Sequence, residues 1–188
     1  MLIASGKLLD MLDVELFGGG DPREPTPDFP DEAQLRAYGD FTFLYLRAQK
    51  YQNHRLRDYR LYLQPPIDLR FFRILRIEGV PRAAITWAFL NEAAEEKLRD
   101  QLPLAPSDWL SGRHVWIMEL IAPFKGTLGA KLTRIFLDGL DGDVQTVRFP
   151  RYHPTGGLKH FTEWHRTPSG KWRTKRLMPE ALAHGTRT

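Results

Sequence analysis

The stretch SGRHVWIMELIAPF, residues 111–124, carries one carboxylate, Glu119, in a run that otherwise favours burial. A carboxylate among apolar neighbours must be hydrogen-bonded, paired with a cation, or protonated. Two interpretations follow from the residues. In the first, Glu119 forms an ion pair with an arginine of a neighbouring strand, such as Arg73 or Arg82. In the second, Glu119 orients a histidine, which accepts a proton from an incoming nucleophile.

Histidines supply the candidate bases. The chain has six, which are His54, His114, His153, His160, His165 and His184. None forms an HExxH motif, so zinc-dependent hydrolysis has no support. His160 and His165, five residues apart, would face opposite sides of a regular strand, which argues against a shared metal ion. His54 lies in the connecting segment QNHRLRD, where a lone histidine is more often a surface residue than a catalyst.

A glycine-containing turn follows the strand-like run. In KGTLGAKL, residues 125–132, Gly126 and Gly129 would let the backbone approach a ligand closely. The N–H groups at the start of the helix that we expect next would attract anions. The run is neither a Walker loop nor GxGxxG, so an ordinary strand–helix connection remains the simpler interpretation.

Composition limits the class of protein. With 188 residues and 42% hydrophobic content, the chain is long enough for one globular domain. No apolar run approaches the roughly 20 residues of a membrane helix, and the first residues are too acidic for a secretory signal. The absence of cysteine excludes disulfides, thiolate metal sites and a cysteine nucleophile. Acidic residues are concentrated in residues 1–40 and basic residues in 151–188, so we expect the basic end to meet an acidic partner, either nucleic acid or protein.

The elements that must position these residues follow from periodicity and turn signals. Residues 8–16 favour a short amphipathic helix, and the Gly- and Pro-rich stretch from residue 18 to 32 a linker. The pattern then predicts a helix within 31–49 capped by Asp31, and two strands within 67–91 joined at Glu78-Gly79. A helix capped by Asn91 is expected over 91–102, followed by a strand over 114–124 that ends at Pro123. The last expected elements are a helix within 125–140, a strand within 144–153, and a hairpin within 158–178 that turns at 168–170. This order predicts a mixed α/β sheet with crossover helices.

Residues 107–124 resemble the signature of a known enzyme family, the RTX toxin-activating lysine acyltransferases, also called the hemolysin-activating protein family. The positions that match are Asp108, Trp109, Ser111, Gly112, Trp116, Ile121, Ala122, Pro123, Phe124 and Gly126, with Lys125 inserted before the glycine. Upstream, Pro81, Ala83, Trp87 and Leu90 match the family's proline–alanine–tryptophan strand and the start of its acidic helix, and downstream KHFTEWH matches loosely. QNHRL aligns His54 with the family's catalytic histidine. The resemblance covers roughly Asp40 to His165.

The resemblance implies a fold, an activity and partners. Members have a mixed sheet similar to that of the N-acetyltransferase (GNAT) superfamily, with a central splayed strand pair. They take a fatty acyl group from acyl carrier protein and place it on internal lysines of an RTX protoxin, in the cytoplasm before secretion. They can be dimeric, span no membrane, and use acyl-acyl carrier protein as co-substrate without a metal or a tightly bound cofactor. Residues 31–178 would then be the acyltransferase domain, with residues 1–30 an extension outside its core and 179–188 a tail.

The same resemblance implies roles for individual residues. His54 would be the general base, and Glu119, which stands where the family usually has aspartate, would hold its imidazole. Substrate-binding positions would be Trp87, Ser111, Trp116, Ala122, Pro123, Phe124 and Gly126. Arg113, Lys131 and Arg134 would help to dock the acidic acyl carrier protein.

Two other functions stay open. One is a coenzyme A-dependent N-acyltransferase acting on another amine, which the strand and glycine turn also permit. The other is a basic nucleic-acid-binding module built on HRTPSGKWRTKR, residues 165–176, with Trp164 and Trp172 to stack on bases.

Overall fold

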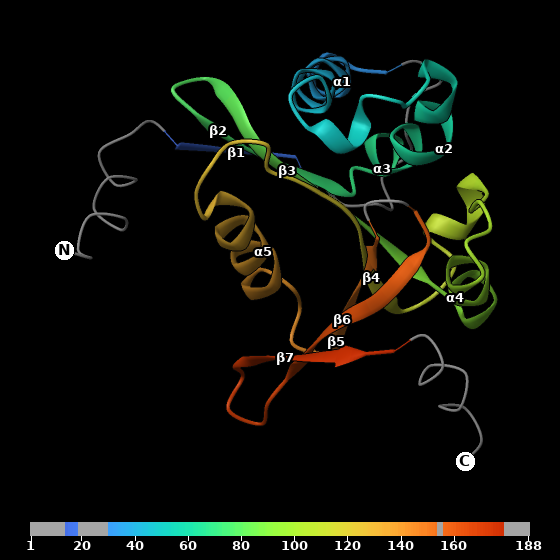
Figure 1. Ribbon diagram of the computed structural model, residues 1–188. Helices are drawn as coiled ribbons and strands as arrows, with labels where there is room; N and C mark the ends of the chain where they lie inside the picture. The colour runs from blue at the N-terminus through green and yellow to red at the C-terminus, as the bar shows by residue number, and fades with distance from the viewer. Residues whose placement is uncertain (1–13, 19–29, 154–155, 179–188) are drawn as a thin grey trace. The chain divides into compact units, whose positions relative to one another are not determined.

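The computed structural model describes residues 14–18, 30–153 and 156–178 and contains a mixed seven-stranded sheet (Figure 1). The strands follow chain order from β1 to β7. The pairs β1–β2, β2–β3, β5–β6 and β6–β7 are antiparallel, and β4 pairs with β5 in parallel. The mixed α/β fold that the sequence predicts is confirmed. The chain divides into two compact units, residues 1–86 with 119–136, and residues 87–118 with 137–188.

The first unit combines antiparallel strands with two groups of helices. Its strands are β1 (Val14–Phe17), β2 (Phe72–Ile77) and the first part of β3 (Val80–Leu90). Its helices are α1 (Glu32–Tyr45), the 3-10 turns η1 (Gln49–Tyr51) and η2 (Leu56–Asp58), α2 (Tyr59–Tyr62), α3 (Gln64–Asp68) and most of α5 (Leu128–Asp138). Figure 1 shows α1, α2 and α3 gathered on one side of these strands and α5 on the other.

Local sequence explains where these elements begin and turn. Asp31 caps α1 and forms a capping box with Gln34, as a short acid followed three residues later by glutamine favours. Glu78 and Gly79 both have positive φ, at 54° and 74°, so the β2–β3 hairpin turns where the sequence predicts it. The strand expected from Ile67 begins only at Phe72, because residues 64–68, which carry Pro65 at the first turn, form α3.

A buried apolar cluster holds the first unit together. It joins α1 and α3 to β2, β3 and the end of β4 (His114–Ile121). Its members are Ala37, Phe41, Leu44, Tyr45, Tyr51, Leu63, Ile67, Phe72, Ile74, Ala84 and Ile121. Each large side chain of this kind contributes roughly 1.5–3 kcal/mol when fully buried. The cluster therefore fixes η1, through Tyr51, against the end of β4, through Ile121.

The structure corrects one expectation about the amino-terminal residues. The sequence placed residues 1–30 outside the core, with a helix over 8–16, yet Val14–Phe17 form β1 and pair antiparallel with β2. The rest of the predicted helix, residues 8–13, lies outside the described residues. Glu15 explains the pairing in part, because it accepts from Arg76 of β2 at 3.2 Å and from Arg36 of α1 at 3.2 Å.

The second unit contains the remaining strands. They are the first part of β4, β5 (Thr146–Tyr152), β6 (Leu158–Arg166) and β7 (Trp172–Leu177), with α4 (Glu92–Arg99) and the 3-10 turn η3 (Pro106–Trp109). Asn91 caps α4, as predicted. The β6–β7 hairpin turns around Gly170, which has a φ of 77°. The predicted central position of β4 is also confirmed, since it is fourth of seven strands.

Candidate functional site

The partner of Glu119 is a lysine. Lys50 Nζ of η1 donates to Glu119 Oε1 at 2.7 Å, although the two residues are 69 positions apart in the chain. The Glu119 side chain is 17% exposed and that of Lys50 is 61% exposed. The pair thus combines a largely buried carboxylate with an accessible ammonium. Neither of the arginines proposed from the sequence takes this place, and the guanidinium of Arg82 lies instead over the ring of Phe124, 5.0 Å from its centroid.

Tyr51 brings the histidine of the early segment to the same place. The imidazole of His54 packs edge-on against the Tyr51 ring, with ring centroids 5.1 Å apart. The same ring lies 4.8 Å from Lys50 Nζ. Burial, and then the charge of Glu119, raise the pKa of the Tyr51 hydroxyl, and the same two causes raise that of Tyr45. The charge of the carboxylate therefore acts on Tyr51, and the imidazole contacts the ring of the same residue.

The contacts of Glu119 differ from the interpretation in which this carboxylate orients a histidine directly. In the described residues no hydrogen bond joins His54 to Glu119, because Lys50 takes the carboxylate and Tyr51 stands beside the imidazole. His54 itself is exposed, as a base that meets a macromolecular substrate must be. Its role as general base stays a prediction. What the structure brings together is an exposed imidazole, a largely buried carboxylate and a lysine ammonium around one tyrosine ring.

The strand that carries Glu119 leads into the glycine turn. Gly126 has a φ of 123°, a conformation that favours glycine. Gly129 lets α5 approach the strand end, since a Cβ there would lie 3.2 Å from Ala122 Cβ. Phe124 packs against the apolar cluster of the first unit. The first N–H groups of α5 have no partner within the helix, so an electropositive helix end follows directly on the Glu119 strand.

Two residues of the matched signature, Asp108 and Ser111, form hydrogen bonds within the second unit. The hydroxyl of Ser111 accepts from the N–H of Asn91 at 3.0 Å and donates to the carbonyl of Asp108 at 2.8 Å. Burial would raise the pKa of Asp108, but hydrogen bonds from Lys97 and from the N–H of Ala105 outweigh it and lower that pKa. These contacts tie η3 to the start of α4. A substrate-binding role for Ser111 stays a prediction, and its hydroxyl is already engaged.

Replacing Gly112 by alanine is expected to destabilise the protein by about 1–3 kcal/mol through overpacking. A Cβ at this position would lie 2.4 Å from the carbonyl oxygen of Leu90 and 2.5 Å from the nitrogen of Asn91, and these backbone atoms cannot move aside cheaply. Thermal unfolding would measure the loss. Gly142→Ala is the matched control, since a Cβ there meets nothing within 4 Å; equal melting temperatures for the two variants would contradict the prediction.

A charged network missed by sequence reasoning occupies the second unit. Glu95 of α4 accepts from Trp116 Nε1 at 2.6 Å and from Arg148 Nη1 at 2.8 Å, and it pairs with His114 Nδ1 at 3.0 Å. Arg148 also donates to Glu163 at 3.0 Å. Trp116, proposed to bind substrate, is fully buried and its indole N–H is satisfied. No sequence motif marks this network, since its members come from four separate elements.

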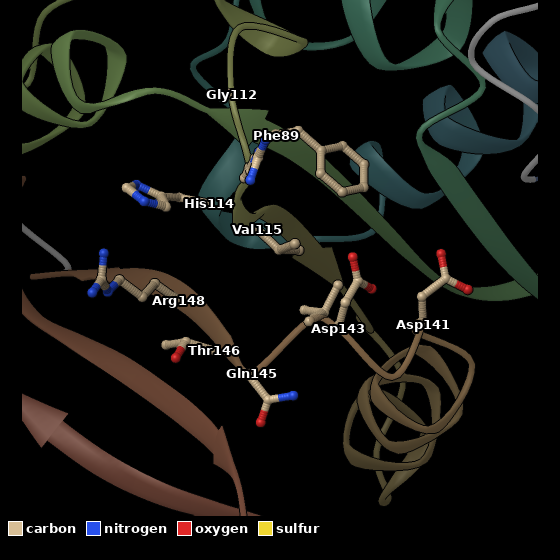
Figure 2. Close-up of a pocket in the computed structure, with 11 residues that line it drawn as sticks. Phe89, Gly112, His114, Val115, Asp141, Asp143, Gln145, Thr146 and Arg148 are labelled. Atoms are coloured by element: carbon tan, nitrogen blue, oxygen red, sulfur yellow. The ribbon is translucent and has the colours of Figure 1, made fainter.

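A pocket of about 540 Å³ lies beside this network (Figure 2). It is bordered by residues at the start of β4 and by the segment that leads into β5, with His114 and Arg148 on one side and Asp141 and Asp143 on the other (Figure 2). Arg113, one of the proposed docking residues, also lines it. The other two docking candidates, Lys131 and Arg134, lie on α5 in the first unit, where Arg134 is exposed. The structure therefore distributes the three predicted docking residues over both units.

The contacts of Trp172 bear on the alternative of a nucleic-acid-binding module. Trp172 donates its indole N–H to the carbonyl of Leu137 at 3.0 Å, and the guanidinium of Arg166 lies 4.7 Å from its ring centroid. One of the two tryptophans offered for base stacking is thus engaged within the protein.

Within residues 14–18, 30–153 and 156–178, no three His, Asp or Glu side chains form a cluster suited to a metal ion, and no helix has the length and apolar character to cross a bilayer.

Comparison with known proteins identifies relatives of this chain. A relative in Kingella kingae, named protein-lysine myristoyltransferase RtxC, is 29% identical over 65% of this chain and 74% of its own length. A leukotoxin-activating lysine-acyltransferase of Mannheimia haemolytica is 26% identical over 70% of this chain and 79% of its own. The loading GNATL domain of CurA from Lyngbya majuscula is similar in structure with a TM-score of 0.46 and 15% identity, over 74% of this chain and 65% of that one.

The family itself is established by a match over most of the folded chain. The model of the RTX toxin acyltransferase (HlyC) family matches residues 31–147, which is more than half of the sequence and includes both His54 and Glu119. The predicted acyltransferase activity is confirmed at the level of the family. This chain belongs to the RTX toxin acyltransferase family.

Proposed function

We propose that this enzyme transfers a fatty acyl group from the phosphopantetheine thioester of acyl carrier protein to internal lysines of an RTX-type protoxin. One observation carries the proposal, which is the 2.7 Å contact between Lys50 Nζ and Glu119. The site already accommodates a lysine ammonium, and an exposed imidazole packs against the same tyrosine ring. The names of the relatives add support, because they describe lysine acylation and leukotoxin activation.

The proposed mechanism begins with the acceptor lysine. A lysine amine with a reference pKa of about 10.4 is protonated at neutral pH and must lose a proton before it can attack. In our proposal Glu119 attracts the incoming ammonium and exchanges Lys50 for it, while His54 accepts the proton. Tyr51 is buried, and its ring packs against the imidazole, so in this proposal it holds His54 in place.

The acyl donor is proposed to lie along the end of β4 and the turn after it. Ala122, Pro123 and Phe124 offer a partly apolar path, and Gly126 leaves the backbone of the turn open to a ligand. The N–H groups at the start of α5 would stabilise the oxyanion that forms on the thioester carbonyl. Trp87 and Trp116 are buried, so in this proposal they support the strands on which the donor rests.

Reconstitution tests the proposal directly. The purified chain would be incubated with fatty acyl-acyl carrier protein and with each of several RTX-type protoxins, and lysine mass shifts would be mapped by mass spectrometry. Parallel reactions would contain fatty acyl-coenzyme A or no acyl donor. Acylation from acyl carrier protein alone supports the proposal. Transfer only from coenzyme A would favour the general N-acyltransferase, and no transfer from either donor would refute both.

Docking of acyl carrier protein is expected to depend steeply on salt. Arg113, Lys131 and Arg134 carry positive charge that would attract its acidic surface. Raising the ionic strength from about 0.1 M to about 1 M shortens the Debye length from about 10 Å to about 3 Å. We therefore expect association to slow by about tenfold or more, as stopped-flow fluorescence would measure. Association that is unchanged by salt would exclude electrostatic steering. The cytoplasmic location and the dimeric state implied by the resemblance stay predictions.

A further inference from the structure

Lys50 is an accessible amine held at the proposed reaction centre. It lies in η1, its side chain is 61% exposed, and its ammonium donates to Glu119 at 2.7 Å. Surface lysines usually gain little from such pairs, yet this partner carboxylate is only 17% exposed. The contact therefore directs an otherwise mobile side chain toward one position.

The base proposed for the reaction contacts the same ring as this amine. Lys50 Nζ lies 4.8 Å from the centroid of the Tyr51 ring, and the centroid of the His54 imidazole lies 5.1 Å from it. Tyr51 is buried in the apolar cluster of the first unit, so it cannot move away from either group without disturbing the core. An acceptor amine, a carboxylate and an imidazole thus surround one fixed residue.

We propose that Lys50 is itself an acyl acceptor, so that the enzyme acylates its own Lys50 when acyl donor is present and protein acceptor is absent. The inference rests on the proposed function, since it uses the same donor and the same base. It adds a modification site in the enzyme itself. Lys50 is accessible to solvent, has a carboxylate partner, and contacts the same tyrosine ring as the imidazole.

The step balances with groups already named. Lys50 Nζ first gives a proton to His54 and leaves Glu119. Its lone pair then attacks the thioester carbonyl, the C–N bond forms and the C–S bond breaks. His54 passes this first proton to water, accepts the second proton from the acylated nitrogen and gives it to the phosphopantetheine thiolate as the thiolate leaves. The step releases one proton to solvent and requires no further reactant. The product is a neutral amide, which cannot form an ion pair with Glu119.

The experiment uses the full-length chain and myristoyl-acyl carrier protein as the donor. After incubation, intact mass would report acyl addition, and peptide mapping would locate it. A parallel reaction would include an RTX-type protoxin whose lysines are mapped in the same way. Hydroxylamine treatment would separate a stable lysine amide from a labile acyl-imidazole. We expect one hydroxylamine-resistant acyl group on Lys50, formed at a rate independent of enzyme concentration at saturating donor, because acceptor and base belong to one chain.

Variants make the assignment specific. Lys50→Arg keeps a positive charge for Glu119 but offers no acylable amine, so the adduct at residue 50 should be lost. Lys159→Arg, at an exposed lysine of β6, is the matched control and should leave the adduct unchanged. His54→Ala should slow formation of the adduct at least tenfold. Melting curves of each variant would verify that it is folded.

The outcomes separate this inference from the function on which it rests. Acylated protoxin together with unmodified Lys50 would overturn the inference and leave the proposed function standing. No acylation of either protein would overturn the proposed function and the inference with it. Adducts that appear equally on many exposed lysines, or that form as fast in His54→Ala, would indicate uncatalysed chemistry and overturn the inference. A labile adduct mapped to His54 alone would also overturn it, in favour of an acyl-histidine.

Discussion

Replacing His54 by alanine is expected to lower the kcat of lysine acylation by about 10²–10⁴-fold, the usual contribution of a positioned general base. The imidazole is exposed and contacts Tyr51 only through its edge, so its removal should leave the core intact. In the proposed function the acceptor is a whole protein, so we expect its KM to depend little on this one side chain. Steady-state kinetics with acyl-acyl carrier protein as donor, with kcat and KM determined separately, would measure the effect.

His153→Ala is the matched control for this prediction. His153 is an exposed histidine of the second unit whose described hydrogen bonds are made by its backbone. This variant should keep the kcat of the unmodified chain and the same melting temperature. If His54→Ala retained more than half of the original kcat, or if both variants lost activity equally, His54 would not be the base.

Local signals in the sequence predict much of the fold. Asp31 and Asn91 have side chains that satisfy helix N–H groups, and Glu78-Gly79 can adopt positive φ, so each marks an element boundary through its own chemistry. Runs of apolar residues likewise predict β2 to β5, and the turn at 168–170 predicts the β6–β7 hairpin. β1 cannot be predicted in this way, because four residues in an acidic segment are too few to show a hydrophobic periodicity. Their pairing with β2 also involves Arg76, which is 61 residues away from Glu15 in the chain.

The candidate site is predicted less completely, for a physical reason. The sequence identifies Glu119 as a carboxylate that needs a partner, since burial of its surroundings can be inferred from its neighbours. It does not identify Lys50, because η1 is three residues long and has no periodicity that would indicate its orientation. The Glu95 network is missed for the same reason. Its ion pair with Arg148 joins positions 53 residues apart, and only the fold brings them together.

Replacing Asp40 by alanine is expected to destabilise the protein by about 3–5 kcal/mol, the usual cost of removing one partner from a buried ion pair. Arg76 is 1% exposed and donates to Asp40 of α1 and to Glu15 of β1. Burial, and then the nearby charge of Arg36, lower the pKa of Arg76, while Glu15 opposes this effect. Loss of Asp40 leaves Glu15, which is 40% exposed, as the remaining carboxylate. Urea denaturation would measure the loss of unfolding free energy, and we expect the melting temperature to fall by roughly 6–20 °C.

Two further variants show whether the buried charge is the cause. Glu15→Ala removes the exposed partner and should cost about 1 kcal/mol or less, as surface ion pairs usually do. Combining Asp40→Ala with Arg76→Met removes the uncompensated charge, so the double variant should be more stable than Asp40→Ala alone. If the double variant were instead less stable, the loss would come from packing of the Asp40 and Arg76 side chains. The buried guanidinium would then not be what ties α1 to β2.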